Sequence, residues 1–443
     1  MELNLPYGRG TVRVTGLPDS ALVLEAPVAT AEPIAPEQLR AVMAEKVQHP
    51  IGGPKLSQWL DGASGVTVVV PDQTRKAGQS AYLPELLSIM ATRGMSRERV
   101  RILIGLGTHP QHAPESLEEV VGSTVYREFG PRGRLAESSG HVEADFELLG
   151  LTSRGTRVAL HRWLCEDQPV LVTGGITYHY YAGYSGGRKG VLPGCAATPS
   201  IRDSHQLAFT TAGSLGLSGA PERVVRQPMA AAGMLLGNPM VEDQLEAVAM
   251  LPQRPFLLNT ITNPHDEIIE MVAGDLIQAH TYGCTLVDQY YQVPVEHAAD
   301  LVIASAGGYP SDINLIQSHK ALDNAVRACA PGGTIVLLAE CSQGLGNPKA
   351  TDWAALGGAE AILQRLGTQF EIIGGTCEGI MRKCEQYQVR LISALPDSVA
   401  RQFGFDFCSS WNGSTLDVSQ YVPHNGHVAI IPAAGITMPV GPA

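Results

Sequence analysis

The arrangement of apolar residues constrains the fold of this chain most strongly, because short β-branched runs repeatedly precede helical patterns. In the first half the runs are Val66 to Val70, Val100 to Ile104 and Val170 to Thr173, and each is followed by Pro or Gly. Between the first two runs, Tyr82 to Arg93 carries apolar residues at helical spacing. Apolar strands that alternate with helices are typical of βα units, so this half predicts a doubly wound, mainly parallel sheet.

A second series of the same kind follows Pro294. The predicted strands are Asp300 to Ala304, Thr334 to Leu338 and Phe370 to Ile373, and Ser318 to Cys329 is a predicted helix. This half therefore repeats the α/β pattern of the first half.

The length of 443 residues suits two domains of this class. We predict an N-terminal cofactor-binding α/β domain over residues 1–293 and a C-terminal α/β domain that contacts the substrate over residues 294–415. Residues 416–443, which contain several Pro and Gly, are expected to pack back on the first domain. The predicted fold class is thus two α/β domains with mainly parallel sheets and an active-site cleft between them.

The charge of the chain argues against nucleic-acid binding. Its 31 Lys and Arg residues are outnumbered by 43 Asp and Glu residues, whereas phosphate recognition needs clustered cations. The segment Met1 to Gly16 lacks the basic start and apolar stretch of a secretory signal, and no apolar run is long enough for a membrane span. We therefore expect a cytoplasmic protein with no nucleic-acid or membrane partner.

The 8 cysteines lie between Cys165 and Cys408 and form no C-x-x-C pair. This spacing disfavours a zinc ribbon, and it disfavours a disulfide framework in a chain of this length. We interpret the cysteines as small core residues.

Polar residues follow each predicted strand of the first half, at the edge where ligands collect in open α/β sheets. Asp72 to Arg75 follow the first strand, Gly107 to His109 the second and Thr177 to His179 the third. A carboxylate, a guanidinium and two imidazoles are therefore expected to converge on one crevice.

The densest motif is Ala182 to Gly194, in which glycine recurs. Glycine at this density lets backbone amides approach an anion closely. A P-loop is excluded, because Arg188 precedes Lys189 and Gly190 follows it, where Gly and Ser or Thr are required. A dinucleotide fingerprint is also incomplete, since Pro110 stands where its third Gly would lie. The alternative interpretation of the motif is a flexible surface loop.

Lys189 in this glycine frame is interpreted either as an anion clamp or as a nucleophile of lowered pKa that bonds covalently to a cofactor. His179 and His205 flank the lysine, and a neutral imidazole of either could ligate a metal. A hydrogen-bonded structural histidine remains the alternative for each.

The second half contains Gly307 to Pro310, followed by a polar stretch that ends at His319 and Lys320. A cation and polar side chains near the start of a helix suit recognition of a small carboxylate. The alternative is an ordinary capped helix with Ser318 as its N-cap.

Taken together, these motifs resemble those of the nickel-dependent lactate racemase family. The resemblance spans both halves of the chain. The matching segments are Leu5-Pro6-Tyr7-Gly8, Asp72-Gln73-Thr74-Arg75, Gly107-Thr108-His109, Tyr184-Ser185-Gly186-Gly187-Arg188-Lys189 with Pro193-Gly194, and the block from Gly307 to Lys320. His179 before the glycine motif and His205 after it belong to the same pattern.

The resemblance implies a nickel-pincer nucleotide, a pyridinium-3-thioamide-5-thiocarboxylic acid mononucleotide that holds nickel. It implies that Lys189 carries this cofactor covalently and that His205 is the protein ligand to nickel. His109 and His179 would be the catalytic acid/base pair. Residues implied in cofactor binding are Asp72, Gln73, Thr74, Arg75, Ser185, Gly186 and Gly187, and those implied at the substrate are Arg75, Ile316, Gln317, Lys320 and Tyr387.

The implied activity is inversion of C2 of a 2-hydroxy acid by proton-coupled hydride transfer. The hydrogen on C2 is too weakly acidic for a side chain alone, and hydride transfer to the cofactor avoids a carbanion. One histidine would take the hydroxyl proton, and the planar 2-keto acid could then accept hydride on its other face. An imidazole, with an ordinary pKa near ~6.5, suits this role at neutral pH. Arg75 and Lys320 would hold the carboxylate meanwhile.

Two positions depart from the lactate racemase pattern. Ile316 stands where lactate racemases tend to carry Tyr, and we place Tyr387 in the role of a Trp expected later in the second domain. Both changes would alter the pocket beside the substrate, so we expect a 2-hydroxy acid other than lactate. A 2-epimerase of aldonates is an alternative within the family.

Two further alternatives belong to other functional classes. A non-catalytic homologue could bind the nucleotide or a carboxylate without turnover, but it would not need both His109 and His179. An NAD-dependent dehydrogenase is disfavoured by the incomplete glycine fingerprint. The implied partners are a small 2-hydroxy acid and the cofactor-synthesis enzymes that would load the protein.

Overall fold

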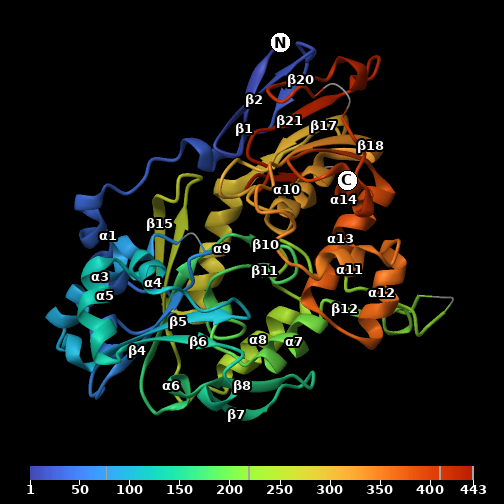
Figure 1. Ribbon diagram of the computed structural model, residues 1–443. Coiled ribbons are helices and arrows are strands. Elements are labelled where there is room, and N and C mark those ends of the chain that lie inside the picture. Colours follow the sequence, from blue (N-terminus) through green and yellow to red (C-terminus); the bar gives the residue numbers. More distant parts are fainter. Residues whose placement is uncertain (76, 218–219, 409–410, 442–443) are drawn as a thin grey trace. The chain divides into compact units, whose positions relative to one another are not determined.

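The computed structural model describes residues 1–75, 77–217, 220–408 and 411–441 (Figure 1). The chain folds into two compact units, each with a mainly parallel sheet and helices. Unit 1 comprises Met1–Ala29, Thr210–Val225 and Tyr290–Ala443, and unit 2 comprises Thr30–Phe209 and Arg226–Gln289. The predicted α/β class is confirmed.

Unit 2 is built around a six-stranded sheet with the order β15-β14-β9-β4-β5-β6. Neighbouring strands run parallel except for the edge pair β14 and β15, which is antiparallel. The strands are β4 (Val66–Pro71), β5 (Val100–Gly107), β6 (Leu135–Ser139), β9 (Val170–Gly175), β14 (Phe256–Thr262) and β15 (Ile268–Asp275). The three strands predicted in the first half, β4, β5 and β9, are therefore adjacent.

The apolar run of β4 is buried because helices cover the sheet. Val68 packs in one apolar cluster with Met43 of α1 (Pro36–Gln48) and Leu83 of α3 (Gln79–Thr92). Each of the three side chains is 0% exposed. Burying a large aliphatic side chain contributes about 1.5–3 kcal/mol, so this cluster fixes the sheet whose strand ends carry the polar loops.

Further helices and short strands complete unit 2. The helices are α2 (Leu56–Trp59), α4 (Pro114–Val121), α5 (Ser123–Phe129), α6 (Arg162–Cys165), α7 (Thr198–Gln206), α8 (Pro239–Ala249) and most of α9 (Leu276–Tyr291). Two short strand pairs are β7 (Phe146–Leu151) with β8 (Arg157–His161), and β10 (Tyr178–His179) with β11 (Gly183–Tyr184). The pair β12 (Phe209–Thr211) and β13 (Val224–Arg226) contains residues of both units.

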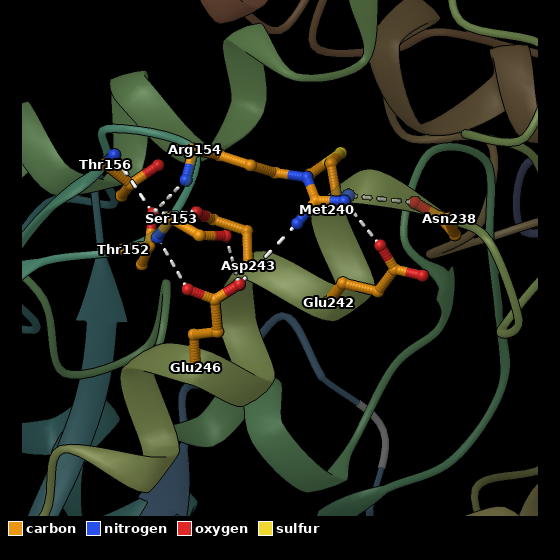
Figure 2. A network of polar contacts seen from close by, with 9 residues as sticks. All are labelled: Thr152, Ser153, Arg154, Thr156, Asn238, Met240, Glu242, Asp243 and Glu246. Atoms are coloured by element: carbon orange, nitrogen blue, oxygen red, sulfur yellow. Dashed lines mark hydrogen bonds and ion pairs between the residues drawn. The ribbon is translucent and has the colours of Figure 1, made fainter.

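A network of polar contacts fixes α8 against the loop that joins β7 to β8 (Figure 2). Thr152 Oγ1 donates to Asp243 Oδ1 at 2.6 Å, and Arg154 forms an ion pair with Glu242. At the start of the helix the side-chain oxygen of Asn238 accepts from the backbone N–H of Met240 at 3.1 Å. Because the first amides of a helix have no partner within it, Asn238 is an effective N-cap.

Unit 1 contains a five-stranded parallel sheet with the order β19-β18-β17-β21-β3. Its strands are β3 (Leu22–Val23), β17 (Ala299–Ser305), β18 (Cys329–Leu338), β19 (Gln388–Ile392) and β21 (Val428–Ile431). Smaller sheets join β1 (Leu3–Tyr7), β2 (Gly10–Thr15) and β20 (Thr415–Asp417), and join β16 (Gln292–Pro294) to β22 (Met438–Val440). The helices are α10 (Leu315–Ala328), α11 (Ala350–Ala354), α12 (Ala359–Thr368), α13 (Ile372–Gln386) and α14 (Asp397–Gln402).

The predicted domain limits need correction at both ends of the chain. Residues 1–29 belong to unit 1 and not to a domain of residues 1–293, because β3 pairs with β21 and β2 pairs with β20. Residues 416–443 do pair with this N-terminal segment, but both segments are part of unit 1. The two segments together complete unit 1, the C-terminal α/β unit.

The strand predicted at Phe370 to Ile373 is also wrong, since α13 begins at Ile372. Ile373, Cys377 and Ile380 are buried at helical spacing. The helical spacing of the buried residues, and not the short apolar run, identifies this segment as a helix.

The longest helix that the structure describes, α9, has 16 residues and a length of about 24 Å. Within the described ranges, no helix has both the length and the apolar character needed to cross a lipid bilayer.

Candidate active site

Three adjacent strands of unit 2 carry the polar residues that the sequence indicates. Asp72 follows β4 directly, His109 lies in the loop after β5, and His179 lies in the hairpin after β9. Parallel strands end at the same edge of a sheet, so these three segments share that edge. The structure therefore brings the predicted carboxylate and both predicted acid/base histidines to one edge of one sheet.

Asp72 anchors the loop after β4 and is 3% exposed. Its Oδ1 accepts from the backbone N–H of Thr74 at 2.9 Å and from the Thr74 hydroxyl at 2.6 Å, and its Oδ2 pairs with Nδ1 of His109. Burial opposes ionisation, but the bond to His109, the charges of Arg75 and His109 and the bond to Thr74 lower the pKa of Asp72 to about 2. Asp72 is therefore a carboxylate at neutral pH.

The contact with Asp72 fixes the tautomer of His109. A carboxylate can only accept hydrogen bonds, so the ring hydrogen of His109 lies on Nδ1 and the lone pair of the neutral ring on Nε2. The side chain is 40% exposed, which leaves the ring within reach of a ligand. This arrangement is that of a general base with an orienting carboxylate.

His179 is held differently, in the hairpin of β10 and β11. Its Nδ1 accepts from the backbone N–H groups of Tyr181 at 3.2 Å and Ala182 at 3.1 Å. A nitrogen that accepts carries no hydrogen, so the neutral ring has its hydrogen on Nε2. The ring of Tyr180 stacks on that of His179 with a centroid distance of 4.9 Å. His109 and His179 are thus held in opposite tautomers.

The glycine motif forms the short 3-10 helix η5 (Gly187–Gly190), which packs closely on its surroundings. A Cβ atom at Gly187 would lie 2.5 Å from Cδ2 of His280, and one at Gly190 would lie 2.6 Å from Cγ1 of Val172 in β9. Gly187 also has a φ of +53°, which L side chains rarely adopt. Close packing and backbone conformation therefore explain the glycines, which contradicts the alternative of a flexible surface loop.

Lys189 lies in η5 and is half-buried. Burial disfavours its ammonium form and the charges of Arg75 and Arg188 repel it, so its pKa lies well below the ordinary value for lysine. A lowered pKa favours the nucleophilic amine over the ammonium that an anion clamp needs, so it suits covalent attachment better than the anion-clamp interpretation. Arg75 influences both Lys189 and Asp72, so these groups share one electrostatic neighbourhood.

His205 of α7 belongs to the same neighbourhood and is 8% exposed. Its Nδ1 donates to the backbone carbonyl of Ile201 at 2.8 Å, which leaves the lone pair on Nε2. Burial, together with the charges of Lys189 and Arg75, outweighs that bond and lowers the pKa of His205 to about 4. The ring is therefore neutral at pH 7, as a metal ligand must be.

The side chains at this site suit a metal whose other ligands come from a cofactor. Within the described part of the chain, no group of three or more His, Cys, Asp or Glu side chains gathers as a metal site. A single neutral imidazole beside a nucleophilic lysine, as at His205 and Lys189, fits an organic cofactor that supplies its own donor atoms. The residues present thus fit the nickel nucleotide that the resemblance implies.

Two of the predicted substrate contacts lie in the first turns of α10 in unit 1. Nζ of Lys320 donates to the side-chain oxygen of Gln317 at 2.9 Å. The N-cap is Asn314, whose side chain accepts from the backbone N–H of Gln317 at 2.9 Å. The alternative of Ser318 as N-cap is therefore wrong, because the helix begins at Leu315.

Tyr387 does not lie near Ile316 within unit 1. Ile316 is in the first turn of α10, beyond the carboxyl end of β17, whereas Tyr387 precedes β19 at the amino end of the sheet. Burial raises the pKa of Tyr387, and the nearby thiol of Cys329, the first residue of β18, raises it further. Cys329 follows the last turn of α10, a helix of 14 residues and about 21 Å. Tyr387 and Ile316 therefore cannot line one pocket.

The structure also contains polar anchors that the sequence analysis missed. They are Asn259, which accepts from the backbone N–H of Gly187; His280, which donates to the carbonyl of Ser185; and Asp288, which accepts from Tyr178 and Tyr184. Each lies on an element that is distant in sequence from the loop it holds. Such a residue gives no local pattern that could have identified it.

Comparison with known proteins gives the family of this chain. A family model described as the lactate racemase N-terminal domain matches residues 7–215, and one described as the lactate racemase C-terminal domain matches residues 295–367. The chain belongs to the lactate racemase family. It is accordingly an isomerase of the racemase class.

Two lactate racemases are similar in sequence to this family member. The lactate racemase of Thermoanaerobacterium thermosaccharolyticum is 27% identical over 354 residues, which cover 80% of this chain and 77% of the relative. That of Lactiplantibacillus plantarum is 28% identical over 305 residues, which cover 68% of this chain and 66% of the relative.

Solved structures confirm the two-domain α/β fold of this lactate racemase family member. The lactate racemase apoprotein of T. thermosaccharolyticum matches with a TM-score of 0.83 at 22% identity, over 99% of this chain and 100% of the other. A structural-genomics protein of Thermotoga maritima matches with a TM-score of 0.64 at 17% identity, over 93% and 99% of the two chains.

Proposed function

We propose that this protein inverts C2 of a small 2-hydroxy acid, with His109 and His179 as the acid/base pair. The observation that carries the proposal is the pair of imidazoles held in opposite tautomers on either side of β4. One Nε2 can accept a proton and the other carries a hydrogen. Inversion needs two such groups, because the hydroxyl proton is removed while one face of C2 reacts and is returned while the other face reacts.

Lys189 and His205 are proposed to hold a nickel-pincer nucleotide, the first by a covalent bond and the second as a ligand to nickel. When bound, this group supplies a site that takes up the hydrogen of C2 as hydride and returns it. The loop from Asp72 to Arg75 and the segment from Ser185 to Gly187 are proposed to line it. The lowered pKa values support these roles, because a lowered pKa favours the nucleophilic amine of Lys189, and a pKa of about 4 leaves His205 neutral at pH 7.

His109 would remove the proton of the substrate hydroxyl. The carboxylate of Asp72 already lies on Nδ1, so the imidazolium that forms keeps a charge-assisted hydrogen bond. No hydrogen bond has to be rearranged for this step. His109 is therefore ready to act as a base.

His179 offers Nε2–H to the oxygen on C2 as a hydrogen-bond donor. Full transfer of that proton from a neutral ring would leave an imidazolate, so Nδ1 has to be protonated first. Protonation of Nδ1 requires the backbone amides of Tyr181 and Ala182 to turn away from it. The two amides therefore oppose the uptake of a second proton by His179.

Arg75, in the loop that also holds Asp72, is proposed to bind the substrate carboxylate. An ammonium held by a neighbouring amide, as in Lys320 and Gln317, is suited to a small anion. Ile316 in the position of a family Tyr favours a substrate other than lactate.

The test uses protein produced together with the cofactor-synthesis enzymes, because protein made without them would be empty. Nickel content, peptide mass mapping of Lys189 and chiral analysis of a panel of 2-hydroxy acids, including lactate and aldonates, are measured on the same sample. His109→Ala and His179→Ala should each lower inversion by about 10² to 10⁴ and keep nickel. His205→Ala should lose nickel instead.

Two results would contradict the proposal. Active, nickel-containing enzyme with an unmodified Lys189 would exclude the covalent role. Equal loss of nickel in the variants of His109, His179 and His205 would show that the acid/base roles are misassigned.

A further inference from the structure

The hairpin that carries His179 is too short to be stable by itself. Its strands β10 and β11 contain two residues each, and pairing is limited to Tyr178 with Tyr184 and His179 with Gly183. Isolated two-stranded hairpins are marginally stable in water at best. The position of His179 must therefore come from contacts outside the hairpin.

Asp288 of α9 supplies a charged contact to both strands. Its Oδ1 accepts from the hydroxyl groups of Tyr178 and Tyr184, each at 2.6 Å. The two tyrosine rings also contact each other, with a centroid distance of 5.2 Å. Hydrogen bonds to an ionised acceptor are roughly twice as strong as neutral ones, so one carboxylate oxygen ties both strands to α9.

The alternation of side chains places this anchor on the face away from His179. Successive residues of a strand point to opposite faces, so Tyr178 and His179 diverge. Tyr184 shares the face of Tyr178 because the two are cross-strand partners. Asp288 thus holds the hairpin from one face and leaves His179 on the other.

The turn between the strands has its own anchors. The side-chain N–H of Asn238, the N-cap seen in Figure 2, donates to the carbonyl of Tyr181 at 2.8 Å, and Nη2 of Arg188 donates to that of Ala182 at 2.6 Å. Asn238 is 0% exposed and Arg188 is 1% exposed. The two residues whose amides face Nδ1 of His179 are therefore fixed separately from the strands.

We propose that Asp288 is a positioning residue for His179, which it fixes by anchoring Tyr178 and Tyr184 to α9. The proposal rests on the proposed acid/base role of His179. The first test therefore measures the position of the His179 ring in a way that does not depend on catalysis.

The first test is NMR of the histidine ring nuclei in the full-length protein, with His179→Ala used for assignment. Asp288→Ala should shift or broaden the His179 signals and leave those of His109 and His205 in place. Tyr178→Phe and Tyr184→Phe, each of which removes one hydroxyl, should give the same change to a smaller degree. Unchanged His179 signals in all three variants, or equal changes at all three histidines, would overturn the proposal.

Tyr282→Phe is the matched control, because Tyr282 is on the same helix and is 49% exposed. It removes a tyrosine hydroxyl without touching the hairpin anchor. Its histidine spectrum should equal that of the unchanged protein.

The second test uses the nickel-loaded enzyme. Asp288→Ala should lower kcat about 10- to 100-fold, as expected for a displaced catalytic group, with KM and nickel content unchanged. Asp288→Asn, which keeps an acceptor oxygen, should recover part of the loss. In a His179→Ala background, Asp288→Ala should cause no further loss, and an equal further loss would show that Asp288 acts elsewhere.

Failure of the proposed function would look different. Loaded enzyme that inverts no acid of the panel would refute the acid/base role, whereas the NMR comparison would still decide whether Asp288 fixes the ring.

Discussion

The loop after β5 and the hairpin after β9 each present a histidine at the same edge of the sheet, but they fix it with different partners. Nδ1 of His109 faces the carboxylate of Asp72, whereas Nδ1 of His179 faces the backbone amides of Tyr181 and Ala182. A carboxylate accommodates a second proton on the ring, and two amides oppose one. The two histidines are therefore not equivalent, and only at His109 is the partner of Nδ1 a side chain that a substitution can remove.

The largest effect that would test this difference is expected for Asp72→Asn. An amide can present a donor as well as an acceptor to Nδ1, so the tautomer of His109 is no longer fixed. We expect kcat to fall about 100-fold, with His179 unaffected, because positioned general bases are worth about 10² to 10⁴. Steady-state kinetics and the NMR signals of both rings measure this. A change at both rings would show that their environments are coupled.

His205 extends the comparison to a third partner, the backbone carbonyl of Ile201. The pKa of His205 is about 4 in the folded chain, against an ordinary value of 6.5. Between these values the unfolded chain binds a proton that the folded chain does not, so the free energy of unfolding falls as the pH falls. His205→Gln should flatten this slope in the cofactor-free protein by up to about 1.4 kcal/mol per pH unit.

Urea unfolding across that pH window measures the slope. Gln206→Asn, at the next position of α7, is a control because it changes an exposed side chain without a titratable group. A slope in His205→Gln equal to that of the unchanged protein would contradict the prediction.

The smallest effect is expected for Thr74, whose hydroxyl donates to Asp72 at 2.6 Å. Thr74→Val removes this bond but leaves the bond from the backbone N–H. One such bond contributes about 0.5–1.5 kcal/mol, so kcat should fall about 2- to 10-fold. Thr74→Ser keeps the hydroxyl and should retain the activity. A loss in Thr74→Val as large as that in Asp72→Asn would mean that Thr74 does more than orient the carboxylate.

The sequence could predict those parts of the site that lie directly after buried strands. β4, β5 and β9 were visible as β-branched runs, so Asp72 and His109 stood out as polar residues at strand ends. Asp288 was not visible in this way, because it is one polar residue of an amphipathic helix and its partners lie about a hundred residues earlier in the chain. Only the tertiary structure brings the three side chains together.

Short elements without a clear period were the least predictable. The run from Phe370 to Ile373 fits a strand or a helix equally well, and the following Gly374 and Gly375 resemble the end of a strand. β3 has two residues, and its partner strand lies near the opposite end of the chain. No local pattern could have assigned residues 1–29 to unit 1.

The pairing of β3 with β21 has a consequence for biosynthesis. Residue 22 is the register partner of residue 429, so the N-terminal segment leaves the ribosome long before its partner strand exists. All of unit 2 has been synthesised once residue 289 has emerged, and domains generally fold as units during translation. β1 and β2 can pair with each other early. β3 stays unpaired, and its unsatisfied backbone groups can form hydrogen bonds with other strands. A nascent chain that stalls before residue 428 would thus carry a folded unit 2 tethered to a unit 1 that cannot close its sheet.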